Sequence, residues 1–235
     1  MRVLITRPVE DSGPLIADLK ARGIEALVAP LLDIEFIDGP QLNLADVQAL
    51  LMTSANGVRA FARRSKNRKI KVMAVGDATA RVAREMGFID VQSATGDVDD
   101  LAAKARQSLD SAGGSLLHPA GSKVAGDLAG LLTADGFSYR REVLYRANTV
   151  DTLPIVAAHG LENDDFAGVL LYSPRTGTTF KRLVETAGLG NKLATVRAYC
   201  LSANVAGSVG GLPWAEVLTA ARPEQAALLD LFDET

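Results

Sequence analysis

Short apolar runs alternate along the chain with amphipathic segments of about 10–15 residues. Val3–Thr6 is almost wholly apolar and predicts a buried strand, whereas Ser12–Arg22 places Leu15, Ile16 and Leu19 on one face of a helix. Gly23 stands where a helix C-cap is expected. The same reading predicts further strands at 25–29, 49–52, 72–75, 116–117, 141–145, 169–172, 196–201 and 215–220, and helices at 57–64, 78–86, 124–134, 176–186, from 204, and at 224–232.

Strands that are apolar almost throughout, each followed by a helix, are typical of parallel sheets that are covered on both faces. Right-handed crossovers then bring the strand-to-helix turns to one edge of each sheet. Ligands bind at that edge in folds of this kind. The pattern therefore predicts an α/β protein whose functional residues follow its strands.

The chain also contains an internal repetition. Leu50–Gly57 resembles Leu170–Gly177, and aligning Ser54 with Ser173 gives an offset of 119. Two further pairs of segments resemble each other in the same way. Residues 74–91 resemble residues 200–217 at an offset of 126, and residues 15–23 resemble residues 128–136 at an offset of 113. Drifting offsets are what loops of unequal length produce. Three modules thus occur twice, which predicts two similar α/β domains; chance similarity among Ala/Leu-rich helices is the alternative.

Composition narrows the class of protein. The chain has 235 residues, of which 48% are hydrophobic and 23% charged, as is typical of one or two globular domains. No apolar stretch approaches about 20 residues, and the first eight residues turn polar too early for a signal peptide. The net charge is −3, with no lysine-rich run. We therefore expect a cytoplasmic protein that binds neither membranes nor nucleic acids.

The residues that most often carry catalysis give no signature here. The chain lacks the glycine-rich nucleotide motifs, the nucleophile elbow and the H-E-x-x-H zinc motif. Cys200, His118 and His159 are too few for a Cys/His zinc site, and a lone cysteine excludes an internal disulfide. Both histidines are expected to be structural or solvated, and Cys200 to be a buried, inert thiol.

Polar side chains recur at the predicted strand-to-helix turns. Helix N-termini attract anions, because their N–H groups are free and the helix dipole is positive there. Ordinary N-capping by Ser, Thr, Asp and Asn is the alternative for any one turn. Five such turns favour a cleft that binds a polyanion: 53–56, 76–79, 120–122, 173–176 and 202–204.

Arginines stand near several of these turns. Arg7 and Arg146 follow strands, while Arg59 and Arg175 lie in the first turns of helices. A guanidinium fork suits carboxylates and phosphates, although any one arginine can equally be a solvated surface charge. Tyr145 ends a predicted strand, where its hydroxyl would reach a sheet edge or its ring would pack in the core.

Taken together, these segments resemble the uroporphyrinogen-III synthase family over essentially the whole chain. Each motif is short, but their order and spacing are specific. The resemblance rests on Leu4–Pro8, Pro30–Leu32, Thr53–Val58, Val75–Ala80, Leu144–Ala147 and Tyr172–Arg175.

The resemblance implies two flavodoxin-like, three-layer domains that are joined by two linker strands, with the active site in the cleft between them. It implies that residues 1–35 and 149–235 form a discontinuous domain 1, that residues 39–145 form an inserted domain 2, and that the linkers lie near 33–38 and 146–150. The repetition taken alone predicts contiguous halves instead.

The implied activity is that of a lyase of tetrapyrrole biosynthesis. It cyclises hydroxymethylbilane with loss of water and inversion of ring D, giving uroporphyrinogen III. The resemblance implies no cofactor or metal, and the implied partner is this linear tetrapyrrole polycarboxylate. We expect a monomer, because a hinged cleft works without a partner subunit. Tyr145 is the implied catalytic residue, and the implied substrate-binding residues are Arg7, Ser54, Asn56, Gly76, Thr79, Ser173, Arg175, Ser202 and Asn204.

Some positions depart from the family pattern. Ala203 and Asn204 stand where many relatives have Ser, Thr or Pro, and Lys123 stands near where many carry an arginine. Asp77 would repel a carboxylate and is expected to cap its helix instead. The main alternative is a non-catalytic, two-lobed binding protein for a small polyanion, which would tolerate Tyr145→Phe. A Rossmann-type cofactor enzyme lacks its glycine fingerprint.

Overall fold

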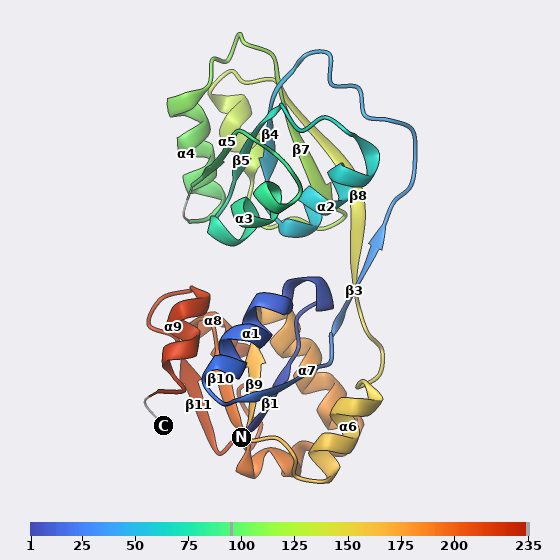
Figure 1. The fold of residues 1–235 in the computed structure, drawn as a ribbon, viewed down its shortest axis with the longest axis vertical. Helices are drawn as coiled ribbons and strands as arrows, with labels where there is room; N and C mark the ends of the chain where they lie inside the picture. The colour runs from blue at the N-terminus through green and yellow to red at the C-terminus, as the bar shows by residue number, and fades with distance from the viewer. Residues whose placement is uncertain (95, 234–235) are drawn as a thin grey trace. The chain divides into compact units, whose positions relative to one another are not determined.

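The computed structural model describes residues 1–94 and 96–233, which divide into two compact units (Figure 1). Unit 1 contains Met1–Asp33 together with the chain from Asn148 onward, and unit 2 is the continuous segment Ile34–Ala147. The contiguous halves that the repetition alone predicts are therefore not formed, because both ends of the chain belong to unit 1.

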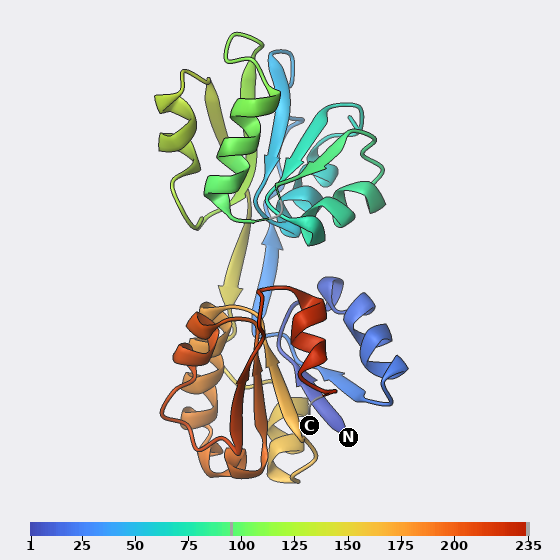
Figure 2. The same cartoon turned by 90° about the vertical axis from the view of Figure 1, so that its left-hand side faces the viewer.

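Unit 1 is built on a five-stranded sheet whose hydrogen-bonded neighbours are all parallel. Figure 2 shows α1 and α9 on one side of this sheet and α7 and α8 on the other. The strand order is β11(Glu216–Thr219)-β10(Arg197–Cys200)-β9(Gly168–Leu171)-β1(Arg2–Ile5)-β2(Glu25–Val28), and the helices are η1(Val9–Asp11), α1(Gly13–Ala21), α6(Ile155–Glu162), α7(Pro174–Thr186), η2(Gly190–Thr195), α8(Ala203–Ser208) and α9(Gln225–Asp230).

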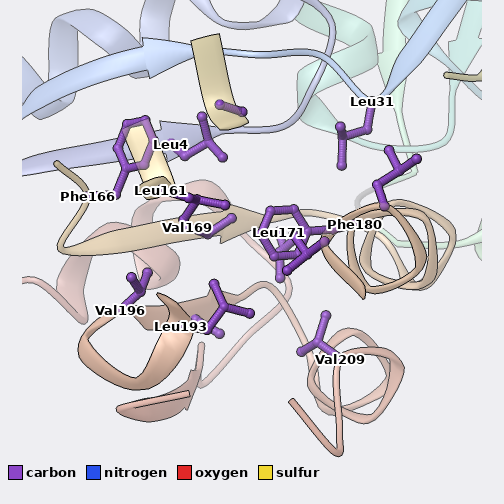
Figure 3. Close-up of a cluster of buried hydrophobic side chains, with 14 of the residues drawn as sticks. Leu4, Leu31, Leu161, Phe166, Val169, Leu171, Phe180, Leu193, Val196 and Val209 are labelled. Carbon is purple, nitrogen blue, oxygen red and sulfur yellow. The ribbon is translucent and has the colours of Figure 1, made fainter. Parts of the chain in front are cut away.

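Two hydrophobic clusters cover the two faces of this sheet. Side chains alternate across a strand, so Leu4 belongs to one cluster and its neighbours Val3 and Ile5 to the other. Figure 3 shows the first cluster, in which Phe180 of α7 packs near Leu171 of β9. The unit therefore has three layers, as the apolar strands predict.

Unit 2 repeats this plan with one additional strand at its edge. Helices α2 and α3 supply one cluster, and α4 and α5 supply the other. The strand order is β3(Leu32–Phe36)-β8(Tyr139–Thr149)-β7(Ser115–Gly121)-β4(Val47–Met52)-β5(Lys71–Ala74)-β6(Val91–Ser93), and the helices are α2(Ala55–Arg64), α3(Asp77–Glu85), α4(Val98–Ser108) and α5(Leu128–Ala134). The neighbours from β8 to β6 are parallel.

The internal repetition of the sequence is confirmed residue by residue in the strand register. In unit 1, Leu4 of β1 lies opposite Val169 of β9; in unit 2, Leu117 of β7 lies opposite Leu50 of β4. These pairs differ by 113 between residues 4 and 117 and by 119 between residues 50 and 169. The offset of 126 relates Ala198, opposite Val169, to Val72, opposite Leu50. Each repeated module therefore occupies the same place in its own sheet.

Several elements differ from the sequence prediction. Helices α4 and α6 and strand β6 were not predicted. Helix α5 begins at Leu128 and not at Val124, because the Asp127 carboxylate caps it by accepting the Gly130 N–H. The segment 141–145 and the linker after it form one continuous strand, β8.

Tyr199 offers a stability prediction in unit 1. Its side chain is fully buried and stacks on Phe232, and its hydroxyl has no hydrogen-bond partner in the described structure. A buried unpaired hydroxyl costs about 1–3 kcal/mol. Tyr199→Phe keeps the ring and is expected to raise the free energy of unfolding by about 1 kcal/mol. Urea denaturation measures this value, and a clear destabilisation would contradict the expectation.

Candidate functional site

The predicted site residues fall into two groups, one at the carboxyl edge of each sheet. In unit 1 the strands that carry them are adjacent, and in unit 2 these strands lie within the run from β8 to β5. The unit 1 group is Arg7 after β1, Ser173 and Arg175 after β9, and Ser202 and Asn204 after β10; the unit 2 group is Ser54 and Asn56 after β4, Gly76 and Thr79 after β5, and Tyr145 in β8.

The turn after β4 is ordered by its own polar side chains. Ser54 is the N-cap of α2, and its Oγ accepts the Asn56 N–H at 3.1 Å. The Asn56 side-chain oxygen in turn accepts a hydrogen bond of 2.9 Å from Arg59. Capping, which the sequence leaves open as the alternative for this turn, therefore occurs at Ser54. It fixes the start of α2 and brings a guanidinium close to it.

Tyr145 packs its ring into the core of unit 2 and is only 8% exposed. Burial raises the pKa of Tyr145, whereas the Ser54 side chain, the Gly121 backbone and the positive charge of Arg141 act in the opposite direction. The phenol therefore keeps its proton at neutral pH and can donate it to an acceptor.

In the turn after β5, Asp77 does not have the capping role that the sequence analysis expects. Gly76 is the N-cap of α3, and Asp77 is the exposed first residue of the helix, where it makes no cap hydrogen bond. The expectation that Asp77 caps α3 is therefore wrong; a carboxylate in the first turn still complements the positive end of the helix dipole. Thr79, predicted to bind substrate, is only 7% exposed.

In unit 1, Ser173 plays the part that Ser54 plays in unit 2. Its Oγ accepts the Thr176 N–H at 3.1 Å, which caps α7, and lies 2.8 Å from the Thr176 hydroxyl. Arg175 is half-buried in the first turn of α7. Ser202 is the N-cap residue of α8 but makes no side-chain cap bond, and Asn204 is exposed.

Arg7 is held against unit 1 and is not freely solvated. Its guanidinium lies 4.5 Å from the centre of the Tyr172 ring and donates to the Gln225 side chain at 3.3 Å. The Asp11 carboxylate is 4.0 Å away. These contacts fix a cation at the end of β1, although Asp11 offsets part of its charge.

Arg146 and Lys123, two further cations considered in the sequence analysis, have exposed side chains. Arg146 forms an ion pair of 3.1 Å with Glu35 of β3, and both side chains are about half exposed. Lys123 is exposed in the turn after β7. The cation that does contact this turn is Arg141, which donates to the Gly121 and Ser122 carbonyls at 2.6 and 2.9 Å. Arg141 begins the predicted strand that ends at Tyr145, but the sequence gives no sign of this contact.

A second feature that the sequence analysis missed lies beneath the turn after β4. His118 of β7 is 2% exposed; its Nε2 lies 2.8 Å from the Thr53 hydroxyl and its Nδ1 lies 2.6 Å from the Tyr139 hydroxyl. Burial, with a smaller contribution from Arg141, lowers the pKa of His118 to about 4. The ring is therefore neutral at pH 7, with one nitrogen donating and the other accepting.

The remaining sequence expectations concern reactive and metal-binding groups. Cys200 is buried as predicted, and burial raises the pKa of its thiol to about 11, which makes it a poor nucleophile. Within residues 1–94 and 96–233, no group of three or more His, Cys, Asp or Glu side chains is arranged to hold a metal ion. None of the helices described there is long and apolar enough to cross a membrane.

Gly57 brings α2 close to β7 beneath the site. A Cβ at this position would lie 2.4 Å from the Pro119 carbonyl oxygen, which is backbone and cannot turn aside. Gly57→Ala is therefore expected to lower the free energy of unfolding by about 1–3 kcal/mol. Gly207→Ala in α8 is the matched control, because nothing lies within 4 Å of its added Cβ. Equal urea midpoints for both variants would contradict the close approach.

Fold and site together define a class: α/β proteins with two doubly wound parallel sheets whose polar, helix-starting turns gather at the carboxyl edges. Within this class, the chain belongs to the uroporphyrinogen-III synthase family, because the family model described as uroporphyrinogen-III synthase HemD matches residues 13–230.

Individual relatives are more distant. The porphyrin biosynthesis protein HemD of Ruminiclostridium josui is 33% identical over 104 residues, which cover 37% of this chain and 20% of that protein. The chain thus matches about a fifth of the length of this curated relative. Uroporphyrinogen-III synthetase of Helicobacter pylori is 16% identical with a TM-score of 0.65, over 100% of this chain and 99% of that one. A mutant uroporphyrinogen III synthase of Thermus thermophilus is 17% identical with a TM-score of 0.52, over 100% and 98%. These structures share the fold.

Proposed function

We propose that this chain is a uroporphyrinogen-III synthase, a lyase that closes hydroxymethylbilane to uroporphyrinogen III with loss of water and inversion of ring D. Family membership is the observation that carries the proposal. The alternative of a non-catalytic polyanion-binding protein is not favoured, because the matched family is one of enzymes in tetrapyrrole synthesis. The reaction needs no oxidant or reductant, since a carbon–carbon bond forms as water leaves.

The turns described above support the choice of substrate. Hydroxymethylbilane carries eight carboxylates, and helix N-termini with hydroxyl and amide side chains can bind such groups without a high fixed charge. Helices α2 and α7 begin at capped turns of this kind, with Arg175 in the first turn of α7 and Arg59 as the fifth residue of α2. Arg7, held over Tyr172, adds a cation at the end of β1. We infer that both carboxyl edges bind substrate carboxylates.

Tyr145 is the proposed catalytic residue. The hydroxyl of the substrate leaves as water once it receives a proton or a strong hydrogen bond, and the electron-rich pyrrole supplies the electrons. A phenol with a raised pKa is a donor that stays protonated, so its help is to polarise the leaving hydroxyl. Orientation of the flexible chain supplies much of the remaining acceleration. We further expect a cytoplasmic monomer.

Product analysis tests the proposal directly. Purified protein is incubated with hydroxymethylbilane that is generated in situ, the products are oxidised, and the uroporphyrin isomers are separated by chromatography. Without enzyme the substrate closes to isomer I, so a sample without protein sets the baseline. Predominance of isomer III is the expected result. Isomer I alone, from protein whose circular dichroism shows a folded α/β chain, would refute the proposed function.

A further inference from the structure

We propose that His118 is a positioning residue for this reaction: with Thr53 and Tyr139 it forms a buried hydrogen-bonded chain that holds the turn from which Ser54 contacts Tyr145. The inference rests on the proposed function and deepens it. His118 does not reach the reacting atoms in this proposal; it acts through the turn after β4.

The chain of hydrogen bonds crosses three neighbouring strands of unit 2. Tyr139 begins β8, His118 lies in β7, and Thr53 directly follows β4. The two contacts of the imidazole, 2.6 Å to Tyr139 and 2.8 Å to Thr53, use both of its nitrogens. A ring held at both ends cannot rotate without losing a hydrogen bond, so it fixes the Thr53 side chain relative to β7.

Thr53 is joined to the proposed catalytic residue through one neighbour. Ser54 follows it directly, caps α2 and lies close enough to the Tyr145 phenol to lower its pKa. A shift of the Thr53 side chain therefore moves the serine beside this phenol. Small displacements of a catalytic group lower its rate strongly because the reaction depends on its alignment.

The repeated architecture argues that the histidine is not needed for the fold. By the offsets of 113 and 119, the positions in unit 1 that correspond to His118 and Thr53 are Ile5 and Tyr172. Ile5 is fully buried and packs in an apolar cluster. The same place in the same sheet thus accepts an aliphatic side chain, so strand packing alone does not require an imidazole.

The hydrogen bonds from His118 to Thr53 and Tyr139 require a neutral imidazole. The charged groups that act here are Arg141 of β8, which opposes a positive imidazole, and Asp127, the N-cap residue of α5, which acts on Tyr139. Burial raises the pKa of Tyr139, so this phenol remains a donor. A protonated imidazole would donate from both nitrogens, and Tyr139 could no longer donate to Nδ1. The geometry therefore predicts that protonation of His118 at low pH weakens these hydrogen bonds.

Steady-state kinetics of isomer III formation test the positioning role. His118→Gln is expected to lower kcat about ten-fold with little change in KM. Because His118 acts through Tyr145, adding His118→Gln to Tyr145→Phe should cause little further loss. Thr53→Ser should retain activity, since it keeps the hydroxyl, whereas Thr53→Val should match His118→Gln. His159→Gln, which removes the other histidine, is the matched control.

Each outcome decides a different question. Wild-type kcat and pH profile in folded His118→Gln, or independent losses in the double variant, would overturn the positioning role and leave the proposed function standing. Isomer I alone from the wild type would overturn the proposed function itself. If His118→Gln fails to fold, the pair Thr53→Val and Tyr139→Phe removes both hydroxyls, leaves the ring in place and decides the same question.

Discussion

Tyr145→Phe is expected to lower kcat for isomer III about 100-fold or more, the usual contribution of a positioned proton donor. The ring of Tyr145 packs in the core of unit 2 and phenylalanine preserves that packing, so KM and the fold should change little. Since unassisted closure yields isomer I, the product mixture should shift toward that isomer. Isomer ratio and kcat are read from the same chromatogram.

Tyr199→Phe is the matched control for this prediction. It removes a phenol hydroxyl of equal size from the core of unit 1, and this hydroxyl has no hydrogen-bond partner in the described structure. It should leave kcat unchanged. A Tyr145→Phe enzyme with wild-type kcat would show that the phenol only packs, and the proposed catalytic role would be lost.

The free energy of unfolding is expected to fall by roughly 3 kcal/mol between pH 6.5 and pH 4 through His118 alone. The pKa of His118 is about 4 in the folded protein and near 6.5 when unfolded, so the unfolded state binds more protons in this window. Stability is therefore complete above pH 6.5 and is lost as the pH falls through the folded value. Urea denaturation at several pH values measures the slope.

Carboxylates also titrate near the lower end of this window, so the comparison must be made with a variant. His118→Gln retains them all and removes only the imidazole. The difference between the two slopes isolates the histidine. Parallel slopes for wild type and variant would mean that the buried ring charges without cost, contrary to its 2% exposure and its two hydroxyl partners.

The repetition was the strongest fold signal in the sequence, because modules that pack alike retain similar apolar positions. Helix α4 is not predicted by the sequence analysis, although Asp97 and Asp100 form a capping box before Leu101. Its buried face is built largely of alanine, which gives little hydrophobic contrast. Strand β6 is only three residues long, which is too short for a period to show.

The candidate site was predictable from the sequence only where a residue interacts with its near neighbours along the chain. Ser54 and Ser173 stand at strand ends and precede helical patterns, so both their place and their capping role can be read from the sequence. Arg141 and His118 act on residues of neighbouring strands, at sequence distances of 20 and 65. Such contacts depend on strand order and register, which periodicity does not specify.

The division of the chain has a consequence for how it folds during synthesis. Unit 2 is one uninterrupted segment that ends at Ala147, so its strands are made before β9, β10 and β11 of unit 1. Strand β1 of unit 1 can pair with β2 soon after both are made, whereas its other neighbour β9 follows about 160 residues later. The side of β1 that pairs with β9 therefore stays unpaired until the whole of unit 2 has been made.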